Sequence, residues 1–229
     1  MSAQLVFDLP QRAARDREAF FVAPSNEEAV HVIDGFADSQ EPVQWLYGPG
    51  GSGKSHLAAV LAAQMPTHAL TLDALDAAMV SEVMATTDGF QAIIIDDVDG
   101  LTAAQEEPLF HLFNHCKNGG PKLLLLSQVP ARQMAINLPD LRSRLAAVPA
   151  VGLAQPDDKL MAGLLDKLFA DRQINLDEKV RDYLVPRIAR DFAAMGALVK
   201  AIDEAALAAQ KPITVPFVAR FLDSYNSVM

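Results

Sequence analysis

The segment from Gly48 to Ser55, GPGGSGKS, constrains this chain more than any other. It matches the pattern G-x-x-x-x-G-K-[ST] at every fixed position, between an expected strand at 44–47 and an expected helix at 56–65. The glycines let backbone N–H groups curl around phosphates, and the N-terminus of the following helix adds its partial positive charge. The sequence therefore predicts a P-loop that holds the phosphates of ATP or ADP.

Two side chains of this P-loop have separate expected roles. Lys54 should reach the β and γ phosphates, and Ser55 should ligate Mg²⁺. The backbone that surrounds the phosphates comes from Gly48, Gly50, Gly51, Ser52 and Gly53. A chance glycine-rich turn is the alternative, and the strand and helix expected on either side argue against it.

An apolar strand at 92–96 ends in two acids, Asp96 and Asp97. Ligands bind at the carboxyl edge of open α/β sheets, which is where such a strand delivers its last side chains. We expect Asp96 to hold Mg²⁺, directly or through water, and Asp97 to polarise the attacking water. The alternative is a solvated strand end, and the position of this strand after the P-loop helix, one strand and one further helix favours the catalytic interpretation.

Two further polar segments have weaker signals. Ser127 and Gln128 end another apolar run and could lie near the γ-phosphate, although an ordinary strand-to-loop transition explains them equally well. Arg142 and Arg144 lie on a short expected helix at 138–145, from which an arginine could reach a phosphate on a neighbouring subunit. Position alone would make both of them surface arginines.

The order of expected elements predicts an α/β domain followed by helices alone. Strands are expected at 44–47, 68–72, 92–96, 122–127 and 147–153, and helices at 56–65, 74–86, 103–116 and 138–145. Strands that alternate with helices are typical of a parallel sheet between helical layers. Amphipathic stretches at 157–172, 177–188, 191–209 and 215–225 then predict a helical lid, with a hinge at Pro156 and Asp157. We expect an extended segment at 1–10, a nucleotide-binding domain at 11–155 and a lid at 156–229.

Composition excludes several classes of protein. The formal charge of −10 opposes direct binding to the DNA backbone, because that affinity comes from Lys and Arg. Cys116 is the single cysteine, so neither an internal disulfide nor a structural zinc site is expected. The sequence contains neither a signal peptide nor eighteen consecutive apolar residues, and we therefore expect a cytoplasmic protein without a membrane span.

Beyond the P-loop, the chain resembles the AAA+ family, and within it the DnaA/Hda branch. The segment at 45–57 is similar to the P-loop of that branch, including His56 after the hydroxyl residue. The segment at 138–145 resembles the one that bears the inter-subunit arginine finger, with Arg144 at the matching position, and 214–218 resembles the end of the Hda members. The resemblance implies that Phe21 and Asn26 lie near the adenine.

The N-terminal sequence QLVFDL is similar to the peptide by which the Hda members dock on the β sliding clamp of DNA polymerase III. Such a peptide needs apolar anchors on an extended terminus and a glutamine at the rim of the pocket. Gln4, Leu5, Phe7 and Leu9 would supply these groups. The alternatives are a strand at a sheet edge or a disordered tail.

The chain also departs from the family pattern. Ala193 stands where the family has a lid sensor arginine, with Arg190 one turn earlier as the candidate substitute, and Gln128 replaces the acid that often ends the sensor strand. These differences predict weak or no ATPase activity when the protein is alone.

The resemblance implies a regulator of replication initiation. In this hypothesis the protein acts with the DNA-loaded clamp to promote hydrolysis of DnaA-bound ATP, through Arg144, and meets DNA only through its partners at the nucleoid. The alternatives are an AAA+ adaptor or helicase loader that needs no clamp, and a free-standing ATPase. The choice between ADP and ATP, and between monomer and homodimer, stays open.

Overall fold

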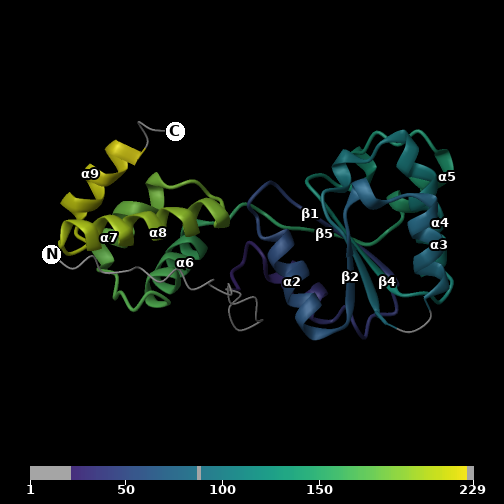
Figure 1. Ribbon diagram of the computed structural model, residues 1–229, viewed down its shortest axis with the longest axis horizontal. Helices are drawn as coiled ribbons and strands as arrows, with labels where there is room; N and C mark the ends of the chain where they lie inside the picture. The colour runs from purple at the N-terminus through teal and green to yellow at the C-terminus, as the bar shows by residue number, and fades with distance from the viewer. Residues whose placement is uncertain (1–21, 87–88, 226–229) are drawn as a thin grey trace.

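The computed structural model describes residues 22–86 and 89–225. Five parallel strands form one sheet in the order β2-β3-β4-β1-β5 (Figure 1). The strands are β1 (Val43–Tyr47), β2 (Thr67–Leu70), β3 (Ala92–Ile95), β4 (Lys122–Ser127) and β5 (Ala150–Gly152). β1 lies between β4 and β5, so that Tyr47 pairs with both Ser127 and Gly152.

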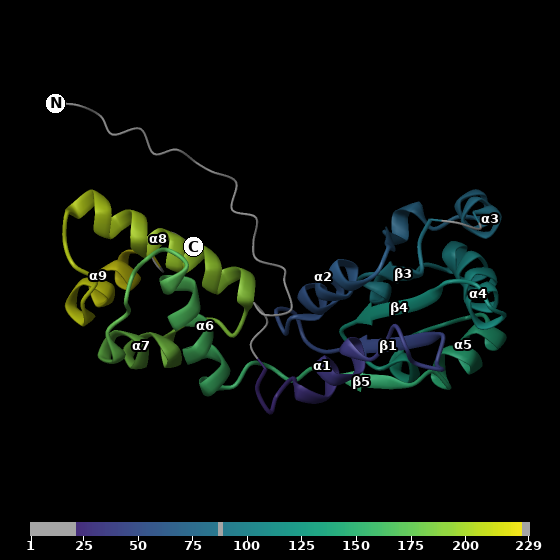
Figure 2. The ribbon, with the colours of Figure 1, turned by 90° about the horizontal axis from the view of Figure 1, so that it is seen from below.

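The two faces of the sheet are covered by different helices, because successive strand residues point to opposite faces. Trp45, Ile95 and Leu125 pack on the side of α3 (Ala77–Ala85), α4 (Ala103–Lys117) and α5 (Pro139–Ala146). Leu46 and Leu124 pack on the side of α1 (Glu27–Asp34) and α2 (Lys54–Gln64). Figure 2 shows the resulting layers, which confirm the α/β architecture predicted from sequence.

Four helices form the lid: α6 (Asp158–Ala170), α7 (Glu178–Leu184), α8 (Phe192–Ala209) and α9 (Val215–Tyr225). Their apolar faces share a core of their own, which includes Leu165, Phe169, Leu184, Ile202 and Val218. Aspartates start three of these helices: the carboxylates of Asp157, Asp177 and Asp191 accept hydrogen bonds from first-turn amides. This part of the chain is the helical lid that the amphipathic stretches predicted.

Helix α1 and the exact extent of some elements differ from the prediction. The first element expected from the sequence is the strand at 44–47, yet α1 precedes it and buries Ala29, Val30 and Ile33. Strand β5 begins only at Ala150, since the chain from 147 to 149 still leaves α5. The segment before α3 forms a short 3-10 helix, Leu72–Ala74.

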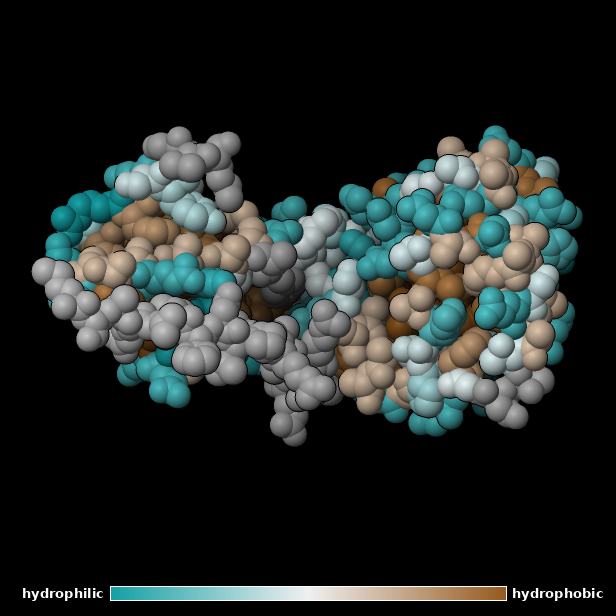
Figure 3. Space-filling model, viewed as in Figure 1, coloured by the Kyte–Doolittle hydropathy of each residue, from teal (hydrophilic) through white to brown (hydrophobic). Residues whose placement is uncertain are grey.

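Hydrophilic and hydrophobic residues are both present on the face drawn in Figure 3. On the face seen in Figure 3, hydrophilic residues surround the margins of both the core and the lid. Within residues 22–86 and 89–225, no helix is both long and apolar enough to cross a membrane.

Candidate functional site

The P-loop joins the carboxyl end of β1 to the N-terminus of α2. Its first residue, Gly48, donates a backbone hydrogen bond of 3.1 Å to the Ser127 carbonyl at the end of β4. Gly51 and Gly53 have φ angles of +71° and +99°, in the region that favours glycine. Gly53 is also the residue from which α2 begins, so the first amides of α2 face the loop.

One side of the loop is packed and the other is open. A Cβ built on Gly48 would lie 2.4 Å from the Leu153 carbonyl oxygen, whereas one on Gly50 would meet nothing within 4 Å. The Ser52 hydroxyl is buried and has no hydrogen-bond partner among the described residues. A phosphate-sized anion therefore has both room beside Gly50 and polar groups that could receive it.

Lys54 folds back over the loop that precedes it. Its Nζ donates hydrogen bonds of 2.7 Å to the Gly48 carbonyl and 3.1 Å to the Pro49 carbonyl. The ammonium group is thus held at the mouth of the loop, within the region that phosphates of a bound nucleotide would enter.

Ser55 and Asp96 come together although they lie on different elements. The Ser55 Oγ donates a hydrogen bond of 2.7 Å to Asp96 Oδ2, and Asp96 Oδ1 accepts one of 2.8 Å from the Asp97 backbone amide. Among the described residues no group of three or more His, Cys, Asp or Glu side chains could hold a metal. One hydroxyl and one carboxylate suit Mg²⁺, which is usually bound by few protein ligands together with water and phosphate oxygens.

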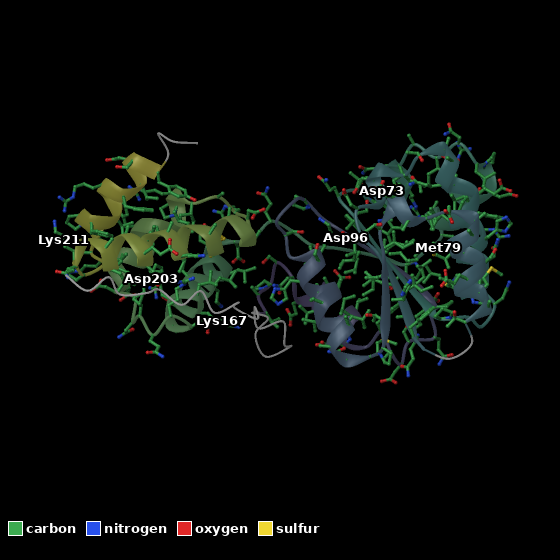
Figure 4. The ribbon with its side chains drawn as sticks, in the orientation of Figure 1. Asp73, Met79, Asp96, Lys167, Asp203 and Lys211 are labelled. Atoms are coloured by element: carbon green, nitrogen blue, oxygen red, sulfur yellow. The ribbon has the colours of Figure 1, made fainter. Side chains whose placement is uncertain are left out.

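Asp97 begins a short 3-10 helix, Val98–Gly100, and adopts a left-handed backbone conformation with φ of +58°. Its side chain is exposed, and with Asp96 it lines a hollow of about 450 Å³ whose wall also includes Thr71, Asp73 and Gln105. Figure 4 places Asp96 on the side of the sheet that faces the lid. The two acids that end the β3 segment therefore lie at the carboxyl edge, where the sequence predicted them.

The sequence interpretation missed Asp99. Its Oδ1 accepts a hydrogen bond of 2.8 Å from the Ser127 hydroxyl, and its Oδ2 accepts one of 2.6 Å from the Gln128 backbone amide. Asp99 thereby ties the loop after β3 to the end of β4. No local sequence signal could have revealed it, because the contact exists only where β3 and β4 lie side by side.

The lid contacts the P-loop through Asp191 rather than Arg190. A Cβ built on Gly51 would lie 2.2 Å from Asp191 Oδ2 and 2.8 Å from Asp191 Cα. Arg190 instead donates to the Pro156 carbonyl and to the Asp158 carboxylate, so its side chain is held at the hinge. A role of Arg190 toward nucleotide stays a prediction.

Asn26 lies at the start of α1 and is 3% exposed. Its Oδ1 accepts a hydrogen bond of 2.8 Å from the Ala23 amide, which fixes the segment before α1. His56 is half-buried in the first turn of α2. Phe21 and the predicted clamp-binding residues Gln4, Leu5, Phe7 and Leu9 lie outside the described residues.

The two arginines of α5 lie far from the P-loop. Helix α5 occupies the end of the core away from the lid, whereas α2 begins on the side of the lid (Figures 1 and 2). Arg142 and Arg144 are both exposed, and the Arg144 guanidinium carbon lies 5.3 Å from the centre of the Phe110 ring. The structure therefore does not bring Arg144 together with the P-loop of its own chain.

Both the lid and the fold as a whole are similar to those of known proteins. Residues 158–222 match the family described as the Hda lid domain. Domain III of the Thermotoga maritima replication initiation protein DnaA has a similar structure, with a TM-score of 0.79 and 18% identity over 94% of this chain and 98% of that one. The lid is therefore similar to that of the Hda family, and the chain as a whole shares the fold of DnaA domain III.

Two further solved structures and one curated protein are also similar to this chain. AMPPCP-bound DnaA from Aquifex aeolicus has a TM-score of 0.71 and 20% identity over 83% of this chain and 65% of that one. An uncharacterized protein of Haemophilus influenzae is 27% identical over 194 residues, which are 82% of this chain and 84% of that protein. The chain spans 63% of a solved DNA replication initiation factor, with which it shares the fold.

Proposed function

We propose that this protein binds ADP or ATP with Mg²⁺ in its own P-loop and presents Arg144 to ATP held by DnaA. The first part is supported by the open side of the P-loop, the position of Lys54 and the hydrogen bond between Ser55 and Asp96. When bound, Mg²⁺ would be held by Ser55 and Asp96 and would offset phosphate charge. Solved DnaA relatives with AMPPCP bound add a precedent for the ligand class.

The observation that carries the second part is the separation of Arg144 from its own P-loop. An exposed arginine in the last turn of α5, a helix at the end of the core away from the lid, can contact a phosphate held by another subunit without any rearrangement of the sheet. Such a residue stabilises charge that develops on the transferred phosphoryl group, and in other NTPases it contributes roughly 10³ to 10⁵ in rate. Hydrolysis of DnaA-bound ATP would inactivate the initiator.

Turnover of its own nucleotide is slow in this proposal. Gln128 is exposed at the end of β4 and supplies no carboxylate, Arg190 is held at the hinge, and Ala193 replaces the lid arginine of the family. The bound nucleotide then serves to stabilise the fold that displays Arg144.

The β sliding clamp is the proposed second partner, through Gln4, Leu5, Phe7 and Leu9. With a net charge of −10, the protein depends on the clamp for its approach to DNA. An adaptor or helicase loader would not need this segment.

The proposal is tested by hydrolysis of DnaA-bound ATP in the presence of DNA-loaded clamp. The wild-type protein should accelerate it, and a Gln4→Ala, Leu5→Ala, Phe7→Ala variant should lose both clamp binding and the acceleration. Acceleration that persists in the variant would contradict the clamp-dependent mechanism. Absence of clamp binding in the wild type, together with nucleotide binding, would favour the loader alternative.

A further inference from the structure

The Arg144 side chain lies against the aromatic ring of Phe110 on α4. Its guanidinium carbon lies over the Phe110 ring, 5.3 Å from the ring centre. Within residues 22–86 and 89–225, its guanidinium has no carboxylate partner and no hydrogen-bond acceptor. A cation within about 6 Å of an aromatic ring is attracted by the ring's quadrupole. The contact therefore orders the arginine without a carboxylate that would neutralise it.

Glu106, on α4, contacts the start of α5, the helix that carries Arg144 in its last turn. It is 4% exposed, and its two carboxylate oxygens accept hydrogen bonds from the backbone amides of Asn137 and Leu138, at 2.9 and 2.7 Å, and from the Asn137 side chain at 3.1 Å. Leu138 is the residue from which α5 begins. A carboxylate at this point satisfies the amides of the two residues that lead into α5 and is favoured by the helix dipole. The start of α5 is thereby fixed to α4.

Burial raises the pKa of Glu106, but the hydrogen bonds from the backbone amides of Asn137 and Leu138 and from the Asn137 side chain together outweigh burial. The pKa of Glu106 is consequently below its usual value. The group is a carboxylate at neutral pH although neutral amides are its hydrogen-bond donors.

Glu106 and Phe110 are one helical turn apart, and residues at i and i+4 share a face of a helix. One face of α4 thus contacts both the start of α5 and the arginine near its end. We propose that Glu106 and Phe110 are positioning residues that hold the Arg144 guanidinium ordered at the surface, ready for a phosphate carried by another subunit. The phosphate part of this inference rests on the proposed function, whereas the ordering of Arg144 does not.

The choice of an aromatic partner has a chemical consequence. A carboxylate partner would take the paired N–H donors with which an arginine binds a phosphate. The Phe110 ring carries no hydrogen-bond acceptor of that strength, so the donors stay available. Ordering the side chain beforehand lowers the entropy lost when it meets its target.

The test measures the order of arginine side chains by ¹⁵N relaxation of their Nε–H groups in the full-length protein. Arg142, which is exposed on the same helix, serves as the internal reference. Arg144 should be more ordered than Arg142 in the wild type. Phe110→Leu, which keeps the apolar contact but removes the ring, should bring Arg144 to the mobility of Arg142, while Phe110→Tyr should preserve the order. Equal mobility of Arg144 in the wild type and in Phe110→Leu would overturn the inference.

The second arm addresses Glu106. Glu106→Gln should reduce the order of Arg144. The side-chain NH₂ group of the glutamine would then face a backbone N–H donor of Asn137 or Leu138, and that donor would lose its acceptor. The matched control for Glu106→Gln is Glu107→Gln, an exposed neighbour on α4. Backbone spectra of β1 and α2 report whether each variant is folded, and the Phe110 pair tests the inference if Glu106→Gln does not fold.

Measuring the hydrolysis of DnaA-bound ATP distinguishes the ordering of Arg144 from its proposed action on the phosphate held by DnaA. Phe110→Leu should lower the accelerated rate roughly two- to fivefold with unchanged binding to DnaA, the range expected for an exposed cation–π contact. Phe110→Tyr, which keeps an aromatic ring, should retain the wild-type rate. Loss of Arg144 order with an unchanged rate would support positioning and contradict the proposed action on DnaA, whereas unchanged order would contradict positioning itself.

Discussion

The Ser55 hydroxyl lies 2.7 Å from Asp96 Oδ2, which joins the start of α2 to the end of β3. These residues are far apart in sequence and meet because the P-loop and β3 end at the same edge of a parallel sheet. The pair supplies the hydroxyl and the carboxylate expected of a Mg²⁺–nucleotide site.

We expect Ser55→Ala to weaken Mg²⁺-dependent binding of ADP roughly tenfold, because one ligand and one hydrogen bond to a charged group are lost. Titration of a fluorescent ADP analogue with and without EDTA measures this effect. In EDTA the variant and the wild type should bind alike. An equal loss in both conditions would argue against a metal ligand.

Gly51→Ala should destabilise the protein by about 1–2 kcal/mol, since an L-residue is strained at positive φ and its Cβ would meet Asp191. Gly50→Ala is the matched control, because a Cβ there meets nothing within 4 Å. Urea unfolding of the two variants compares their free energies of unfolding. Equal stability of the two variants would contradict the described contact between the lid and the P-loop.

The stability contributed by Glu106 should depend on pH in a defined direction. Its pKa in the folded protein is below the unfolded value of 4.5, so its contribution is present above pH 4.5 and is lost as the pH falls through the lower folded value. Wild-type stability should therefore fall more steeply on acidification below that pH than the stability of Glu106→Gln. Parallel curves with a constant separation would show that Glu106 does not titrate in this way.

Cys116 should be unreactive in the folded protein. It is fully buried, and burial raises the pKa of its thiol to about 12, so very little thiolate exists at pH 8. A disulfide reagent such as DTNB should react with it only after unfolding by denaturant. Rapid reaction of the native protein would contradict the described packing of α4.

Much of this arrangement could be predicted from the sequence because its signals are local. The P-loop pattern, the apolar runs of β3 and β4 and the helical periodicity of the lid each depend on consecutive residues. Helix α1 is absent from the expected elements because it has only eight residues and begins with two glutamates, so its apolar periodicity is short.

The missed site contacts are tertiary. Asp99 meets Ser127 and Gln128 only because β3 and β4 are neighbours in the sheet, and Glu106 meets the start of α5 only because α4 and α5 pack side by side. No spacing within the sequence encodes either contact. The close contact between Asp191 and Gly51 likewise depends on how the lid packs against the core.

The central claim is that Arg144 acts on nucleotide held by another subunit. The most direct test is hydrolysis of DnaA-bound ATP with DNA-loaded clamp, in which Arg144→Ala is compared with Arg142→Ala. The account predicts that Arg144→Ala loses the acceleration by roughly 10³-fold or more, while it still folds and still binds ADP, and that Arg142→Ala retains most of it. Equal acceleration by Arg144→Ala and the wild type would contradict the account.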